Sequence, residues 1–166
     1  DNLKIDDETK QVVPNTTFEI KKDNKLIKTV ETGSDGKAVL KDLYPGIYQI
    51  KETKANTNYE INSKVLTVEL KYGETTKITI SNKHKTGSLR IYKVDADDEK
   101  LPIEGVKFEI TDSIGKKKTI ETNKEGIAYI DNIRTGGITI KEIETNEIYE
   151  LPNETYKLEI QYNKTC

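Results

Sequence analysis

The sequence predicts an all-β chain built from two tandem β-sandwich domains. Short runs rich in Val, Ile, Thr and Tyr alternate with turn signals such as Ser34-Asp35-Gly36 and Lys124-Glu125-Gly126. No segment keeps the period of an amphipathic helix for long. The chain also repeats itself after 90 residues, so the same set of strands is expected twice.

The repeat is visible at matched positions in both halves of the chain. Phe18-Glu19-Ile20 returns as Phe108-Glu109-Ile110. The same offset relates the pairs Glu31/Glu121, Gly36/Gly126, Ala38/Ala128, Glu52/Glu142, Tyr59/Tyr149 and Tyr72/Tyr162. We therefore expect one domain over residues 1–84 and a second over residues 85–166, each near the lower size limit for an independent core.

Seven strands are expected in the first repeat, near residues 2–6, 17–22, 26–31, 38–42, 46–53, 63–71 and 75–82. The turn at Ser34-Asp35-Gly36 separates the third strand from the fourth, and Pro45-Gly46 opens the fifth. Tyr72-Gly73 divides the sixth strand from the seventh. Seven short strands are typical of a sandwich of two sheets. The second repeat opens near Ser88, only a few residues after Asn82.

Composition excludes several classes of function. The chain has 33% hydrophobic and 34% charged residues, which favours small sandwiches over a large pocketed enzyme. Its 27 basic and 29 acidic side chains nearly cancel and are interspersed, so we expect no nucleic-acid partner and no contact with an anionic membrane. No apolar run is long enough for a membrane-spanning helix. Without a signal peptide or an initiating Met, the chain is expected to be a piece of a longer protein.

The single cysteine and the single histidine predict neither a disulfide nor a metal site. Cys166 is the last residue, so it is either a free thiol or an intermolecular link. His84 lies between the repeats with no second His or Cys nearby in the sequence, and we interpret it as linker surface. No cofactor is expected.

Several strands end an apolar face with a polar side chain, because residues two apart in a strand share a face. These faces are Tyr48-Ile50-Glu52, Ile138-Ile140-Glu142, Leu89-Ile91-Lys93 and Ile78-Ile80-Asn82. Lys, Glu and Asn are costly to bury unless they pair or react. The pattern therefore marks these polar residues as candidates for a site.

The motifs follow one order along nearly the whole chain. They are Lys4-Ile5-Asp6 and Lys93-Val94-Asp95, then Phe-Glu-Ile, then Gly-hydrophobic-Tyr ahead of Ile50-Lys51-Glu52-Thr53, and finally Asn82-Lys83. This arrangement resembles the collagen-adhesin B-type (Cna B-type) repeats of Gram-positive surface adhesins and pilins. The resemblance implies immunoglobulin-like or prealbumin-like β-sandwiches in a cell-wall-anchored extracellular protein, whose anchor lies outside this segment.

The resemblance also implies a spontaneous isopeptide bond between Lys4 and Asn82, with Glu52 as the acid that promotes it. An amine attacks an amide only when it is unprotonated, and burial favours the neutral forms of an amine and a carboxyl group. The fold would supply the proximity, and the carboxyl group would shuttle protons as ammonia leaves. The alternative is an ordinary salt bridge beside a hydrogen-bonded Asn at a strand end.

The second repeat departs from this pattern at its end. Lys93 and Glu142 are expected to form a half-site, but the ungapped alignment places Asn163 opposite the turn residue Gly73. The second sandwich is thus expected to lack its last strand and to be truncated at its C-terminus. The asparagine partner of Lys93 is then expected beyond residue 166 or on another chain. The alternative, Asn163 itself as the partner, requires a deletion in the alignment.

These features favour a structural stalk segment whose partners are adjacent repeats of the same chain. Its only chemistry would be a crosslinking reaction that happens once within each molecule, so it is not expected to be an enzyme. One alternative is an adhesive module that binds a host extracellular-matrix protein such as collagen. Another is an accessory β-domain of a secreted enzyme.

Overall fold

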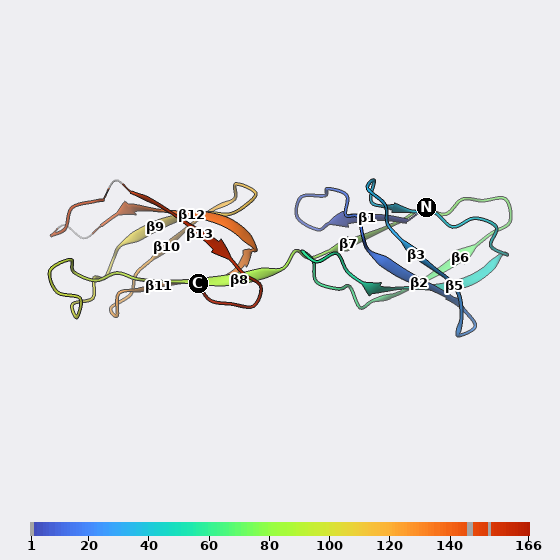
Figure 1. Ribbon diagram of the computed structural model, residues 1–166, viewed down its shortest axis with the longest axis horizontal. Coiled ribbons are helices and arrows are strands. Elements are labelled where there is room, and N and C mark those ends of the chain that lie inside the picture. The colour runs from blue at the N-terminus through green and yellow to red at the C-terminus, as the bar shows by residue number, and fades with distance from the viewer. Residues whose placement is uncertain (1, 146–147, 153) are drawn as a thin grey trace. The chain divides into compact units, whose positions relative to one another are not determined.

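The structure is a computed structural model that describes residues 2–145, 148–152 and 154–166. Its regular structure consists of strands β1 to β13. The described residues contain no helix, and therefore no helix that could cross a membrane. The chain divides into two compact units, Asp1–His84 (unit 1) and Lys85–Cys166 (unit 2) (Figure 1). The predicted all-β fold with two sandwich domains is confirmed.

Unit 1 is a sandwich of two sheets. Its strands are β1 (Asn2–Asp6), β2 (Thr17–Lys22), β3 (Lys25–Glu31), β4 (Lys37–Ala38), β5 (Gly46–Lys54), β6 (Val65–Leu70) and β7 (Ile78–Asn82). One sheet has the order β4-β1-β7 and the other β3-β2-β5-β6. The core between them contains Phe18, Ile20, Tyr48, Ile50 and Ile80, all of which are buried.

Three strands of unit 1 are shorter than the sequence predicts. The fourth strand, expected at 38–42, spans only Lys37–Ala38, the sixth, expected at 63–71, spans Val65–Leu70, and the seventh begins at Ile78 instead of residue 75. A strand is defined by its pairing, and Ala38 pairs with Asn2, the first residue of β1. The residues after Ala38 therefore have no strand beside them within the described part of unit 1.

Unit 2 repeats the architecture. Its strands are β8 (Thr86–Tyr92), β9 (Lys107–Thr111), β10 (Lys117–Glu121), β11 (Ile127–Arg134), β12 (Gly136–Glu144) and β13 (Thr155–Ile160). They form a four-stranded sheet, β10-β9-β12-β13, and a two-stranded sheet, β11-β8. Thr165 adds an isolated parallel bridge to Ser88, on the strand that corresponds to β1.

The register of unit 1 brings its first and last strands together. β1 pairs in parallel with β7, so that Lys4 lies opposite Ile80 and Asp6 opposite Asn82. In the other sheet, Phe18 lies opposite Glu52 in the antiparallel ladder of β2 and β5. Side chains that face inward from β1, β5 and β7 therefore meet between the two sheets.

Candidate functional site

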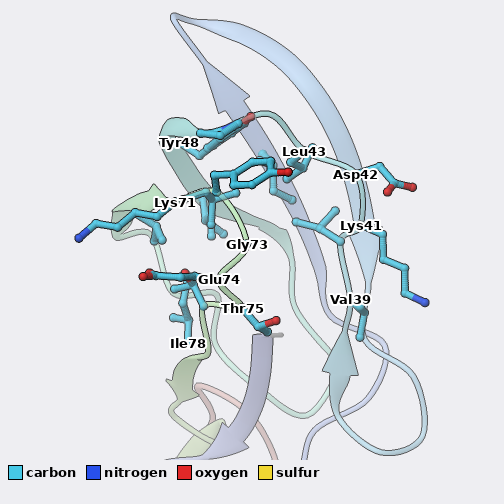
Figure 2. Close-up of a pocket in the computed structure, with 18 of the residues that line it drawn as sticks. Val39, Lys41, Asp42, Leu43, Tyr48, Lys71, Gly73, Glu74, Thr75 and Ile78 are labelled. Atoms are coloured by element: carbon cyan, nitrogen blue, oxygen red, sulfur yellow. The ribbon is translucent and has the colours of Figure 1, made fainter.

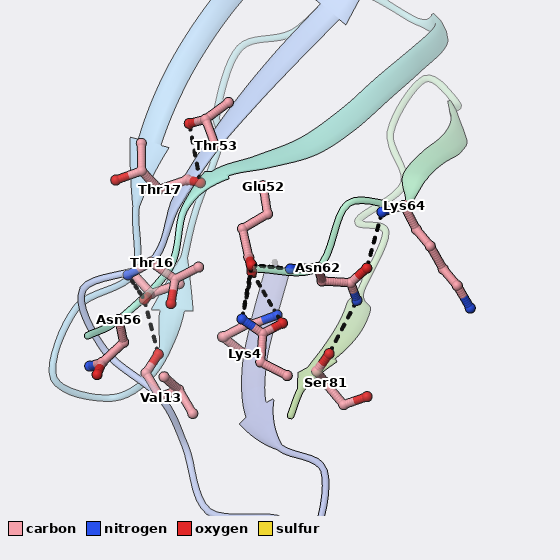
Figure 3. A network of polar contacts seen from close by, with 12 residues as sticks. Lys4, Val13, Thr16, Thr17, Glu52, Thr53, Asn56, Asn62, Lys64 and Ser81 are labelled. Carbon is pink, nitrogen blue, oxygen red and sulfur yellow. Dashed lines mark hydrogen bonds and ion pairs between the residues drawn. The ribbon is translucent and has the colours of Figure 1, made fainter. Parts of the chain in front are cut away.

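Three polar side chains singled out in the sequence meet inside unit 1. Lys4, Glu52 and Asn82 are 0%, 2% and 2% exposed. Nζ of Lys4 donates to Oδ1 of Asn82 and lies 2.8 Å from Oε1 of Glu52. Nδ2 of Asn82 donates to both oxygens of Glu52, at 3.0 and 2.9 Å. The three groups form one closed network, and Figure 3 shows it around Lys4 and Glu52.

Burial changes the acidity of the lysine. Desolvation lowers the pKa of Lys4 from its ordinary value, and the hydrogen bond and charge of Glu52 oppose this effect only in part. The aromatic ring of Phe18, whose centroid lies 5.8 Å from Nζ, forms part of the surroundings. A lowered pKa raises the fraction of Lys4 in the neutral form, which is the nucleophilic form of an amine.

A backbone group completes the surroundings of Glu52. The N–H of Asn62 donates to Oε2 of Glu52 at 2.6 Å, and the Asn62 side chain donates to the carbonyl of Ser81 at 3.2 Å (Figure 3). This contact fixes the carboxylate and ties the loop before β6 to β7. Sequence reasoning missed Asn62, because any residue except proline carries a backbone N–H.

A glycine turn holds the backbone of Lys4. The N–H of Lys4 donates to the carbonyl of Gly36 at 2.8 Å, and Gly36 adopts a φ of 71°. A Cβ at this position would lie 2.7 Å from Cβ of Val12 and 3.0 Å from the Lys4 carbonyl. The close approach explains why a glycine stands here in both repeats, as Gly126 is hydrogen-bonded to Lys93 in the same way.

The aspartate of the Lys-hydrophobic-Asp motif has a structural role that sequence reasoning did not assign. Asp6 is buried and accepts a hydrogen bond from the hydroxyl of Tyr59 at 2.6 Å. In unit 2, Asp95 accepts from Tyr149 at 2.9 Å. The recurrence of both members at matched positions was the signal available in the sequence. These pairs tie the end of the first strand to the loop after β5 or β12.

The surroundings of the second pair shift both pKa values. The pKa of Asp95 is lowered, first by the backbone N–H of Asp97 and then by the hydroxyl of Tyr149. The pKa of Tyr149 is raised, chiefly because its hydroxyl donates to Asp95. The Asp95 carboxylate is therefore stabilised in its ionised form.

Unit 2 contains an incomplete counterpart of the buried network. Nζ of Lys93 lies 3.3 Å from Oε2 of Glu142, and the two side chains are 29% and 3% exposed. Oε1 of Glu142 is buried and has no hydrogen-bond partner among the residues that the structure describes. Pro152 stands at the position of Asn62 and has no N–H to donate. The carboxylate of unit 2 thus lacks two of the donors that surround Glu52.

Asn163 is not brought to Lys93. Its N–H donates to the carbonyl of Thr86, the first residue of β8, whereas Lys93 follows the last residue of that strand. Asn163 has a φ of 54°, and Gly73, its counterpart in the ungapped alignment, has a φ of 73°. The structure therefore places Asn163 in the turn that Gly73 occupies in unit 1.

The single histidine and the single cysteine are not part of the Lys4–Glu52–Asn82 network. His84, expected on the linker surface, is half-buried, and its ring packs edge-on against Tyr59 with the centroids 5.1 Å apart. Cys166 is an exposed free thiol. Within the described ranges, no group of three or more His, Cys, Asp and Glu residues is placed to hold a metal ion.

Comparisons with known proteins agree with the architecture. The family described as SpaA, prealbumin-like fold domain, matches twice, over residues 2–84 and 87–166. The structure of the Bacillus anthracis TIE protein is similar at 31% identity and a TM-score of 0.75 over 98% of this chain, which spans 31% of the TIE chain. GBS52, the minor pilin of Streptococcus agalactiae, aligns at 21% identity and a TM-score of 0.45, over 99% of this chain and 84% of its own. BcpA, the major pilin of Bacillus cereus, aligns at 13% and 0.46, over 99% and 96%. No curated protein matches.

Proposed function

Because the chain belongs to the SpaA family of prealbumin-like fold domains, we propose that it is a structural stalk segment of a cell-wall-anchored Gram-positive surface adhesin or pilin. In this proposal, unit 1 is stabilised by an isopeptide bond that forms spontaneously between Lys4 and Asn82. The observation that carries the proposal is the buried contact of the Lys4 amine with the Asn82 amide beside the carboxyl group of Glu52.

The geometry suits a direct acyl transfer. The neutral amine of Lys4 attacks Cγ of Asn82, a bond forms between Nζ and Cγ, and the bond from Cγ to Nδ2 breaks. Nδ2 already donates to Glu52, so this carboxyl group is placed to accept a proton from Nζ and to return one to the leaving nitrogen. One proton stays on the new amide, and Nδ2 leaves as ammonia.

Such a bond suits a segment that carries load. It would join β1 directly to β7, so a pull on the ends of unit 1 would pass through the crosslink and bypass the residues between Lys4 and Asn82. The bond would withstand reducing conditions, unlike a disulfide. The reaction happens once in each molecule, so the chain performs no catalytic turnover.

Intact mass tests the crosslink. The unmodified chain is expected to be lighter than the sum of its residues plus water by one ammonia, about 17 Da, and peptide mapping is expected to join Lys4 to Asn82. The variants Lys4→Ala, Glu52→Gln and Asn82→Ala should restore the full mass. Lys93→Ala, at the matched position of unit 2, should keep the loss. An unmodified chain of full mass would refute the crosslink.

For unit 2, we propose that Lys93 and Glu142 are half of a second crosslinking site. The missing asparagine would come from a strand that pairs with β8 as β7 pairs with β1. The parallel bridge between Ser88 and Thr165 sets the register of such a strand, and the unpartnered Oε1 of Glu142 is placed to receive an amide.

A fusion tests this second site. A copy of residues 77–83, joined directly after Cys166, places its asparagine at the position that matches Asn82. The fusion is expected to lose a second ammonia, and Lys93→Ala in the fusion should abolish that second loss alone. A single loss in the fusion, with unit 2 folded, would contradict the half-site and leave the proposal for unit 1 intact.

A further inference from the structure

A groove opens at the end of unit 1 where β1 begins. It has a volume of about 530 Å³ and lies between the segment 39–43 after β4 and the segment 72–76 before β7. Figure 2 shows Val39, Lys41 and Leu43 on one side, and Gly73 and Thr75 on the other. Its apolar lining includes Ile20, Tyr48, Leu70 and Ile78. Asn2 pairs with both Ala38 and Ile78, so β1 enters between the two walls.

Unit 2 shows what occupies the equivalent space. There β11 continues to Arg134, because β8 pairs with it from Tyr92 back to Thr86. Ile130 lies opposite Leu89, and Arg134 lies opposite Thr86. The 90-residue offset relates the segment 130–134 to residues 40–44, which include one wall of the groove in unit 1.

The second wall of the groove, the segment 72–76, also has a counterpart in unit 2. In unit 2, the N–H of Ser88 donates to the carbonyl of Lys164, and the N–H of Cys166 donates to the carbonyl of Ser88, both at 2.8 Å. The counterparts of Lys164 and Cys166 are residues 74 and 76, which line the groove. In unit 2, residues 86–90 therefore run between β11 and residues 164–166. In unit 1, the counterparts of these two segments form the walls of the groove.

We propose that this groove is the binding site of an added β-strand, namely an extended peptide joined ahead of β1 that pairs antiparallel with residues 40–44 and parallel with residues 74–76. The proposal goes beyond the crosslink and does not depend on it. It assigns unit 1 a binding site for a backbone in extended form, of the kind that strand addition uses.

The side chains of unit 2 define the peptide that fits. Leu89 is 1% exposed and belongs to the core, so the matching position requires a large aliphatic side chain. A Cβ on Gly87 would lie 2.2 Å from the carbonyl oxygen of Gln161 and 2.9 Å from Cγ2 of Ile160. The counterparts of these two residues are Lys71 and Leu70, which line the groove. Ala38 pairs with Asn2, and its counterpart Ala128 pairs with Ile91, so the residues of β1 and β8 correspond at an offset of 89. The groove therefore selects the pattern Gly-x-Leu, with the leucine directly ahead of residue 1.

An N-terminal extension tests the proposal. The sequence Thr-Gly-Ser-Leu, a copy of residues 86–89, is joined ahead of residue 1 of the full chain, and amide hydrogen exchange is measured across unit 1. Exchange of the amides in segments 39–43 and 74–78 is expected to slow about tenfold or more relative to the chain without the extension. The thermal midpoint of unit 1 should rise as well.

Two matched extensions serve as controls. In one the leucine is replaced by aspartate, and in the other the glycine is replaced by valine; neither should protect the two segments. Equal protection by all three extensions, or protection by none, would overturn the proposal. Every version should retain the mass loss of unit 1, so a failure here is distinguishable from a failure of the crosslink.

Discussion

Thr16 and Val106 occupy the same position in the two repeats, and threonine has a hydroxyl group where valine has a methyl group. Both residues are 0% exposed, and within the described part of the chain Oγ1 of Thr16 has no hydrogen-bond partner. A buried hydroxyl without a partner costs free energy, so Thr16→Val is expected to stabilise unit 1 by about 1 kcal/mol. Urea unfolding measures the change. The reverse substitution, Val106→Thr, should destabilise unit 2 by a similar amount, and a loss of stability in Thr16→Val would contradict the argument.

The backbone N–H of Asn62 supports a second prediction. Asn62→Pro removes the donor to Glu52, whereas Asn62→Ala keeps it and removes only the side chain that donates to Ser81. A hydrogen bond to a charged group is worth about 1.5 to 3 kcal/mol, so the proposed crosslinking should slow about tenfold or more in the proline variant. Intact mass at successive times after cell-free synthesis gives the rate. Equal rates in the two variants would show that the N–H does not matter.

The pKa of Asp95 gives a prediction about pH. The pKa of Asp95 is lowered in the folded state, so ionisation of this carboxyl group stabilises unit 2. The stabilisation is fully present above the unfolded-state pKa near 3.8. It is lost as the pH falls through the lower pKa of the folded state. Tyr149→Phe removes one of the causes, so the NMR titration midpoint of the Asp95 carboxyl group should rise. The matched variant in unit 1, Tyr59→Phe, should leave it unchanged. An unchanged midpoint in Tyr149→Phe would contradict this assignment.

At the scale of elements, the turn after β3 is expected to depend on Gly36. Gly36 and Gly73 have nearly the same φ, but only Gly36 has neighbours where a Cβ would be placed. Gly73→Ala should therefore cost only backbone strain, about 1 kcal/mol. Gly36→Ala adds a clash with Val12 and the Lys4 backbone and should cost about 2 to 4 kcal/mol. Denaturant unfolding compares the two variants, and equal costs would mean that the space around Gly36 relaxes.

Strand alternation predicted much of the fold because its physical cause is local. Residues two apart share a face, so Tyr48, Ile50 and Glu52 were expected to point the same way, and all three are buried. The fourth strand was predicted too long, because its end depends on a neighbour that local sequence does not reveal. Pairing partners decide where a strand stops, whereas composition decides only where one is favoured.

The candidate site was predictable only in part, for a similar reason. Lys4, Glu52 and Asn82 carry side chains whose burial needs an explanation, so the pattern drew attention to them. Asn62 contacts Glu52 through its backbone N–H, which every residue except proline has, so its residue type did not indicate this contact. The contact between Asp6 and Tyr59 joins residues that are far apart in the sequence, and only the folded chain places them together.

At the scale of the whole molecule, the two units have separate cores and should unfold in separate transitions. The proposed bond between Lys4 and Asn82 would close a long loop and should stabilise unit 1 by about 4 kcal/mol. Asn82→Ala should therefore lower the thermal midpoint of unit 1 by roughly 20 °C in a calorimetric scan. The core substitution Ile110→Val, in contrast, should move only the transition of unit 2. A single transition that shifts in both variants would contradict independent unfolding.

The parallel pairing of β1 with β7 has a further consequence. Since the two strands run in the same direction, tension applied at the start of β1 and at the end of β7 slides one strand along the other. Their backbone hydrogen bonds, in register from Asn2 opposite Ile78 to Asp6 opposite Asn82, are then strained together instead of opening one after another. Even in a variant that cannot form the covalent bond, unit 1 should rupture abruptly in a shearing geometry, as a single sharp peak in an optical-tweezers extension trace.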